Sequence, residues 1–167
     1  MLFRSLLNQR GHPASALKVL DDMVPRAPAS LPLIAGQLAQ LAITTGRGEP
    51  VLATLKANYA LSASIDVLEA IVTLETLAGE GSTAARDWYL RHLEREPSLV
   101  AAAKWIAGEK LEHEQFHPLV QRALDHAVKP LTRYRCAACG FEAKQHFWQC
   151  PGCQAWDSYP ARRVEEL

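Results

Sequence analysis

The feature that most constrains this chain is the arrangement of its four cysteines, which form two Cys-x-x-Cys pairs near the C-terminal end. The pairs are Cys136 with Cys139 and Cys150 with Cys153, and ten residues separate them. A Cys-x-x-Cys turn lets two thiolates reach one metal ion from a single tight loop. Two such turns complete a tetrahedral sulfur site of the kind that Zn²⁺ or a single iron prefers. Gly140 follows the first pair, where a metal-binding turn commonly needs a residue that tolerates positive φ.

Two other uses of four cysteines fit the sequence less well. Two disulfides, in any of three pairings, belong in an oxidising compartment. Residues 1–8 are too short for a signal peptide and lack its cleavage region. A redox site of the thioredoxin type needs one Cys-x-x-Cys pair and not two. Reduced cysteines and the lack of an export signal therefore indicate the cytosol.

Bulk charge argues against several classes of partner. The chain has 167 residues with 18 Lys+Arg and 18 Asp+Glu, so its formal net charge is zero. This balance points to no nucleic acid, anionic membrane or acidic ligand. No run of about 18 apolar residues occurs, so the printed residues predict no transmembrane helix. The chain begins inside an amphipathic pattern without a helix cap ahead of it, which is typical of a fragment of a longer protein.

Residues 1–130 are expected to be helical almost throughout, because alanine and leucine dominate while glycine and proline occur at intervals that mark turns. The expected helices span residues 1–10, 13–26, 31–45, 48–60, 64–78, 82–95, 98–112 and 115–128. Their expected N-terminal caps are Ser30, Ser64, Ser82 and Ser98. Helix ends are expected near Gly46, Gly48, Gly79 and Gly81.

A period of 34 residues runs through this helical part, where Ser30, Ser64 and Ser98 are each followed by an apolar residue. A second register pairs Ala16, Leu20 and Pro28 with Ala85, Tyr89 and Pro97, 69 residues later. The pattern resembles tetratricopeptide repeats, in which a small residue sits where two helices cross and proline closes the unit. We therefore predict a mostly α fold with a solenoid of about four helical hairpins over residues 1–130, two of them degenerate. A non-repeating helical bundle is the alternative. Repeat solenoids expose a curved groove that binds peptides or proteins and implies no catalysis.

Residues 131–167 are expected to form a small metal module. A segment below about 40 residues rarely folds on a hydrophobic core alone, whereas a structural metal supplies about 10–16 kcal/mol of apparent free energy in zinc modules. Four aromatic residues are expected to cover the metal site and attach it to the last helices, namely Phe141, Phe147, Trp148 and Trp156. Stacking of nucleic acid bases is the alternative role, but acidic residues offset the basic residues of the module.

The histidines and charged clusters have simpler interpretations than catalysis. His146 lies four residues before Cys150 and is expected to be solvated or capping rather than a ligand. His113 and His117 share a helix face, but the intervening residues lack the acid of a zinc protease helix and Pro118 follows, so we expect residues of a helix start. A solvated face is expected for Glu109, Lys110, Glu112 and Glu114. No phosphate loop, nucleophile elbow or paired-carboxylate pattern is present, so we predict no enzyme.

The cysteine-bearing segment resembles rubredoxin, because a Cys136-x-x-Cys139-Gly turn is followed by a second turn, Cys150-Pro-x-Cys153. It departs from electron-carrying rubredoxins in being shorter and in placing Gln154 where those usually have glycine. Together with the helical hairpins, the segment is similar to the C-terminal part of the lipopolysaccharide assembly protein B family of Gram-negative bacteria. The matching motifs lie in about the last 34 residues, and beside the cysteines they comprise Tyr134, Phe141, Trp148 and Trp156.

This resemblance implies a regulatory adaptor that is anchored in the inner membrane by an N-terminal helix and faces the cytoplasm. Family members promote degradation of the lipid A deacetylase by the FtsH protease. The resemblance also implies one iron ion, bound by Cys136, Cys139, Cys150 and Cys153 in a module that packs back on the repeats. The membrane helix and the first repeats of the family have no counterpart in the printed residues.

Three functional hypotheses follow. The first is a non-enzymatic adaptor with protein partners, for which a homo-oligomer stays open. The second is a redox protein that passes electrons from an iron tetrathiolate to a partner docked on the repeats. The third, a zinc ribbon that binds nucleic acid, is disfavoured by the neutral charge of the module. The choice between iron and zinc stays open because four thiolates accept either metal.

Overall fold

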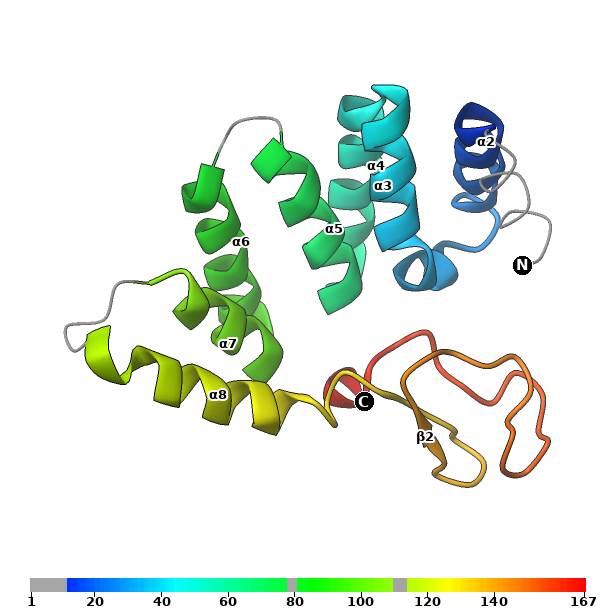
Figure 1. The fold of residues 1–167 in the computed structure, drawn as a ribbon. Helices are drawn as coiled ribbons and strands as arrows, with labels where there is room; N and C mark the ends of the chain where they lie inside the picture. The colour runs from blue at the N-terminus through cyan, green and yellow to red at the C-terminus, as the bar shows by residue number, and fades with distance from the viewer. Residues whose placement is uncertain (1–11, 78–80, 110–113) are drawn as a thin grey trace. The chain divides into compact units, whose positions relative to one another are not determined.

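The computed structural model describes residues 12–77, 81–109 and 114–167, which fall into two compact units within residues 1–85 and 86–167. The chain is mostly helical and ends in a small cysteine-bearing module, which confirms the predicted fold class (Figure 1). The predicted helix 1–10 and His113 lie outside the described residues. Among the helices of the described part, none has both the length and the apolar character needed to cross a bilayer.

The first unit is built around one central helix. Helix α3 (Ala35–Thr45) packs against α2 (Pro13–Met23), α4 (Gly48–Leu61) and α5 (Ile65–Glu75), and α4 also packs against α5. The largest fully buried side chains of the unit are Leu17, Leu20, Leu31, Leu38, Leu55, Leu68, Ile71, Val51 and Val67. Each buried leucine stabilises the fold by about 1.5–3 kcal/mol relative to an exposed one. Consecutive helices that pack on their neighbours in this way are consistent with the predicted repeat hairpins.

Prolines move two helix boundaries away from their predicted places. The helix predicted over 13–26 ends at Met23, because Pro25 lacks the N–H that would continue the ladder. The helix predicted over 31–45 begins at Ala35 and is preceded by a 3₁₀ helix, Pro28–Leu33, with Pro32 inside it. Ser30 therefore caps no α-helix. Gly46 does end α3, in the left-handed conformation at φ 68°.

The second unit contains α6 (Gly81–Arg95) from Arg86 onward and the helices that follow it. Helix α6 leads to α7 (Leu99–Ala107), and α8 (His117–Val128) packs against α7 after a short 3₁₀ helix, Glu114–Phe116. The side chain of Ser98 accepts a hydrogen bond from the backbone N–H of Ala101 at 2.9 Å, which confirms the predicted cap of α7. The helix predicted over 98–112 is shorter, because the chain makes a tight turn at Gly108. There the backbone N–H groups bond to carbonyl oxygens three residues earlier.

The cysteine-bearing module follows α8 and contains little regular structure. Strand β1 (Tyr134–Arg135) pairs antiparallel with β2 (Glu142–Ala143), with Tyr134 opposite Ala143. The chain ends in a 3₁₀ helix, Val164–Glu166, which returns to the segment before β1. There Val164 N donates to Arg133 O at 2.8 Å. The two ends of the module are thereby held together.

Candidate metal centre

Each Cys-x-x-Cys pair lies in a tight turn, and the two turns repeat one backbone pattern. Gly140 N donates to Cys136 O at 2.8 Å, and Gln154 N donates to Cys150 O at 2.8 Å. The residue that closes each turn has a positive φ, 77° at Gly140 and 62° at Gln154. The predicted need for a residue that tolerates positive φ after the first pair is confirmed, and the second turn meets the same need with glutamine.

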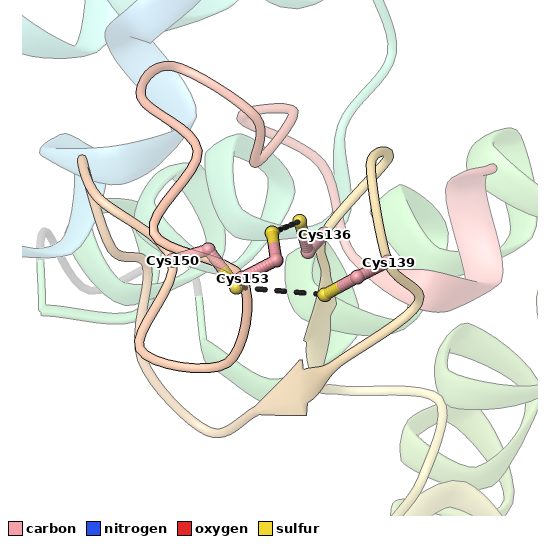
Figure 2. A group of neighbouring side chains, drawn as sticks. All are labelled: Cys136, Cys139, Cys150 and Cys153. Carbon is pink, nitrogen blue, oxygen red and sulfur yellow. Dashed lines mark hydrogen bonds between the residues drawn. The ribbon is translucent and has the colours of Figure 1, made fainter.

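The two turns bring the four cysteine sulfurs together (Figure 2). The Sγ atoms of Cys136 and Cys153 are 3.8 Å apart, those of Cys139 and Cys150 are 3.7 Å apart, and all four lie within 4.8 Å of one another. None of the four is in a disulfide. A tetrahedron with metal–sulfur bonds of about 2.3 Å has sulfur–sulfur edges of about 3.8 Å. The cluster therefore has the composition and size of a metal-binding site.

One cysteine of each turn is buried and one is exposed. Cys136 and Cys150 are each 1% exposed, whereas Cys139 and Cys153 are exposed to solvent. The buried sulfurs have polar neighbours. The Cys136 thiol donates to Ser158 Oγ at 3.2 Å, and the N–H of Gly152 donates to Cys150 Sγ at 3.4 Å. Hydrogen bonds to sulfur spread the negative charge that a thiolate carries when it binds a metal.

The pKa values of the cysteine thiols differ within the cluster. When Cys136 is ionised, the Ser158 hydroxyl can donate to its thiolate, and this hydrogen bond lowers the pKa of Cys136 to about 6, against the opposing effect of burial. The pKa of Cys139 is raised to about 12: the backbone N–H of Phe141 lowers it, but a hydrogen bond with Cys153 and then burial outweigh that effect. Burial also raises the pKa of Tyr159, to about 12, so its hydroxyl keeps its proton at neutral pH. Since thiolates are the ligands, metal binding would release protons from this cluster.

His146 is a packed residue of the module and not a solvated one, so that part of its prediction is wrong. Its ring makes edge-to-face contacts with the rings of Tyr134, Trp148 and Tyr159 at 4.9 to 6.0 Å. Its Nε2 lies 3.0 Å from the carbonyl oxygen of Tyr159. This hydrogen bond and the surrounding rings hold the imidazole within the module, and His146 is not a member of the cysteine cluster.

His117 likewise occupies a structural place. It begins α8, as predicted, and its Nε2 lies 3.2 Å from the carbonyl oxygen of Ile106 in α7. This hydrogen bond joins the two helices of the last hairpin.

The aromatic residues expected to cover the cluster are for the most part on the surface. Phe141 is 44% exposed, Trp148 is 45% exposed and Trp156 is 69% exposed, so these three side chains lie on the surface of the module and do not form a buried core. Two tyrosines occupy the interior instead, Tyr134 and Tyr159, each 5% exposed. Neither tyrosine was expected in the interior, although Tyr134 belongs to the matching motif, because no regular spacing distinguishes a buried tyrosine in so short a module.

Comparison with known proteins agrees with this geometry. Residues 134–159 match a family model described as a rubredoxin metal binding domain. The chain is 31% identical over 96 residues to lipopolysaccharide assembly protein B of Escherichia coli K12, a match that covers 54% of this chain and 25% of that protein. It is 24% identical over 84 residues to the protein of the same name from Haemophilus influenzae, covering 47% of this chain and 21% of that protein.

The matches thus span about a quarter or less of the length of these curated relatives. The predicted resemblance is confirmed: this chain is similar to lipopolysaccharide assembly protein B and carries a segment that matches the rubredoxin metal binding domain.

Proposed function

We propose that this chain is part of a non-enzymatic adaptor of the lipopolysaccharide assembly protein B type. Helical hairpins over residues 1–130 would present a protein-binding surface, and residues 131–167 would form a module that holds one metal ion. The observation that carries the proposal is the convergence of four cysteine sulfurs within 4.8 Å in a chain that is similar to that assembly protein. The division of the chain at residues 130 and 131 is part of the proposal.

The proposed ligands of the metal are Cys136, Cys139, Cys150 and Cys153. Four thiolates close the coordination shell of a tetrahedral ion and leave no position for a substrate, so the ion would cross-link the two turns. A module with two strands of two residues each has few other sources of stability. By resemblance the ion is iron, and zinc would take the same four ligands.

The proposed partners follow from the resemblance to the family. They are the FtsH protease and the lipid A deacetylase, and the proposed place is the cytoplasmic face of the inner membrane, reached through an anchor outside these residues. A homo-oligomer is compatible with the same role. The support for these proposals is the 31% identity to lipopolysaccharide assembly protein B over 96 residues.

A capture experiment tests the adaptor role. The purified chain, checked for one bound metal ion by mass spectrometry under native conditions, is immobilised and exposed to the FtsH protease or the deacetylase. We expect capture by the wild type and loss of capture when the four cysteines are replaced by serine. Lys144→Ala, which changes an exposed residue of the same module, is the matched control. Undiminished capture by a metal-free serine variant that still folds would contradict the role of the module.

Electron transfer from an iron tetrathiolate is the second candidate. The observation that favours it is the exposure of Cys139 and Cys153, which brings one ligand of each turn to the surface. Reversible bleaching of an iron–thiolate absorption band on reduction, with turnover by a reductase, would support electron transfer. A protein from its native host that contains only zinc would end this candidate, because zinc has no redox chemistry.

A further inference from the structure

Two consecutive hydroxyl residues beyond the second turn lie against the two buried sulfurs. Ser158 Oγ is 3.2 Å from Cys136 Sγ, in the first turn. The hydroxyl of Tyr159 is 3.8 Å from Cys150 Sγ, in the second turn. Each buried sulfur of the site therefore has one hydroxyl neighbour, and the two hydroxyls belong to residues that are adjacent in the sequence.

Each hydroxyl also contacts a carbonyl oxygen of the opposite turn. Ser158 Oγ donates to Ala155 O at 3.2 Å, and Ala155 O also accepts from the backbone N–H of Cys150 at 2.9 Å. The hydroxyl of Tyr159 donates to Phe141 O at 3.1 Å, and Phe141 O also accepts from the N–H of Cys136 at 3.0 Å. Because a cysteine N–H already satisfies each carbonyl, either hydroxyl can turn its proton to sulfur without leaving a carbonyl unpaired.

The backbone holds these two residues in place. The carbonyl oxygen of Ser158 accepts from the N–H of Ala137 at 2.7 Å, inside the first turn. The carbonyl oxygen of Tyr159 lies 3.0 Å from Nε2 of His146, and the Tyr159 ring meets that of Phe147 edge-on at 6.1 Å. Oriented side chains of this kind are what a metal site uses to fix its ligands.

We propose that Ser158 and Tyr159 are positioning residues of the metal centre, whose hydroxyls donate to the sulfurs of Cys136 and Cys150 in the metal-bound protein. The inference rests on the proposed four-cysteine site and goes beyond its ligand set. The two donors stabilise charge on the two buried sulfurs, which have no access to water, while solvent does this for the exposed Cys139 and Cys153. The pair therefore controls how tightly the buried half of the site holds its metal.

The test uses the full chain loaded with Co²⁺, whose thiolate charge-transfer bands report on the sulfurs directly. Ser158→Ala and Tyr159→Phe each remove one hydroxyl and keep the rest of the fold. We expect each to lose Co²⁺ to a chelator at least about tenfold faster, the lower bound for loss of an outer partner. We also expect the charge-transfer bands to move to lower energy, since a sulfur without its donor gives up an electron more easily.

Two control variants separate the hydroxyl effect from packing. Ser158→Thr keeps a hydroxyl and should restore both the rate and the bands. Tyr134→Phe removes a hydroxyl from the other buried tyrosine of the module, whose ring lies against His146, and should leave the bands unchanged. If Ser158→Ala and Ser158→Thr both lose the metal, the size of the side chain matters and not its hydroxyl, which overturns the role of Ser158.

The outcomes also distinguish this inference from the proposed function. In one outcome the wild-type chain binds one Co²⁺, and Ser158→Ala, Tyr159→Phe and Tyr134→Phe show the same bands and the same loss rates. This result overturns the positioning role and leaves the proposed metal site intact. A wild-type chain that binds no Co²⁺ in a direct titration overturns both.

Discussion

The carboxylate of Glu165 accepts a hydrogen bond from the backbone N–H of Val100 at 3.0 Å, so the C-terminal tail caps the first turn of α7. Its other oxygen accepts from the hydroxyl of Ser98 at 3.1 Å. The N–H groups of a first turn have no partner within their helix, and a negative charge there is favoured by the helix dipole. The backbone N–H of Glu165 donates to Leu131 O at 3.2 Å, so the same residue also contacts the segment before β1, at the start of the metal module.

Replacement of Glu165 by alanine should lower the free energy of unfolding of the second unit by about 1.5–3 kcal/mol, the range for hydrogen bonds to a charged group. Chemical denaturation followed by circular dichroism measures the change. The matched control is Glu94→Ala, which removes an exposed carboxylate from α6. Equal stability of the two variants would show that the cap contributes nothing measurable.

The two serines predicted to cap helices should respond differently to alanine. Ser98 accepts from Ala101 N and donates to Glu165, so Ser98→Ala should cost about 0.5–2 kcal/mol of stability. Ser64 precedes α5 without a side-chain cap, and its buried hydroxyl has no hydrogen-bond partner among the described residues. Ser64→Ala should therefore be close to neutral, because it removes a buried polar group that gains nothing there. A larger loss for Ser64→Ala than for Ser98→Ala in thermal melts would reverse this order.

The contrast between these serines shows what sequence alone can predict. The 34-residue period placed Ser64 and Ser98 correctly, each directly before a helix. Whether a side chain caps depends on its rotamer and its neighbours: Ser98 accepts from the nearby Ala101 N, but it also donates to Glu165, 67 residues later. No local pattern carries that contact.

The metal centre shows the same limit. Cys-x-x-Cys spacing was enough to predict which sulfurs converge, since each turn is local and its closing residue is set by backbone geometry. The residues around the sulfurs were not predictable in this way. Tyr159 and Ser158 reach them from outside both turns, and the exposed Trp156 was mistaken for core because hydrophobicity alone does not say which side of so small a module faces water.

Removal of the metal should unfold the two cysteine-bearing turns while leaving the first unit folded. If the ion is the main source of stability for the module, a chelator should abolish hydrogen-exchange protection of the amides of Gly140 and Gln154, which close the turns. The amides of Leu38 and Leu68 serve as controls, because they donate within the helical part at 2.8 and 2.9 Å. Unchanged protection of the turn amides after chelation would contradict a structural role for the metal.

His92 should make stability depend on pH in one direction. It is 3% exposed in α6, and burial lowers its pKa below 6.5, although Glu165 and Glu96 oppose this effect. Between the lowered folded pKa and the unfolded value the unfolded chain binds more protons, so stability falls as pH decreases below about 6.5.

The variant His92→Gln isolates this contribution. The stability of the wild type minus that of the variant should rise with pH and then level off above about 6.5, in denaturation curves recorded from about pH 5 to about pH 8. Curves that stay parallel over that range would show that His92 does not carry the dependence.

The turns that hold the cysteines differ in the residue that closes them. Exchanging these residues should show the free-energy cost of placing a side chain at positive φ. Gly140 and Gln154 both have positive φ, at 77° and 62°, a conformation that costs a side-chain-bearing residue about 1–2 kcal/mol. A Cβ at Gly140 would meet no atom within 4 Å, so Gly140→Gln should destabilise the metal-loaded chain by backbone strain alone. Gln154→Gly should relieve that strain, but by less than about 1 kcal/mol, because glycine gains more freedom in the unfolded chain.

Gly46→Gln, at φ 68° in the first unit, is the matched control for strain away from the metal. Thermal melts of the metal-loaded variants measure all three, and a stabilising Gly140→Gln would disprove the assignment of strain to these turns.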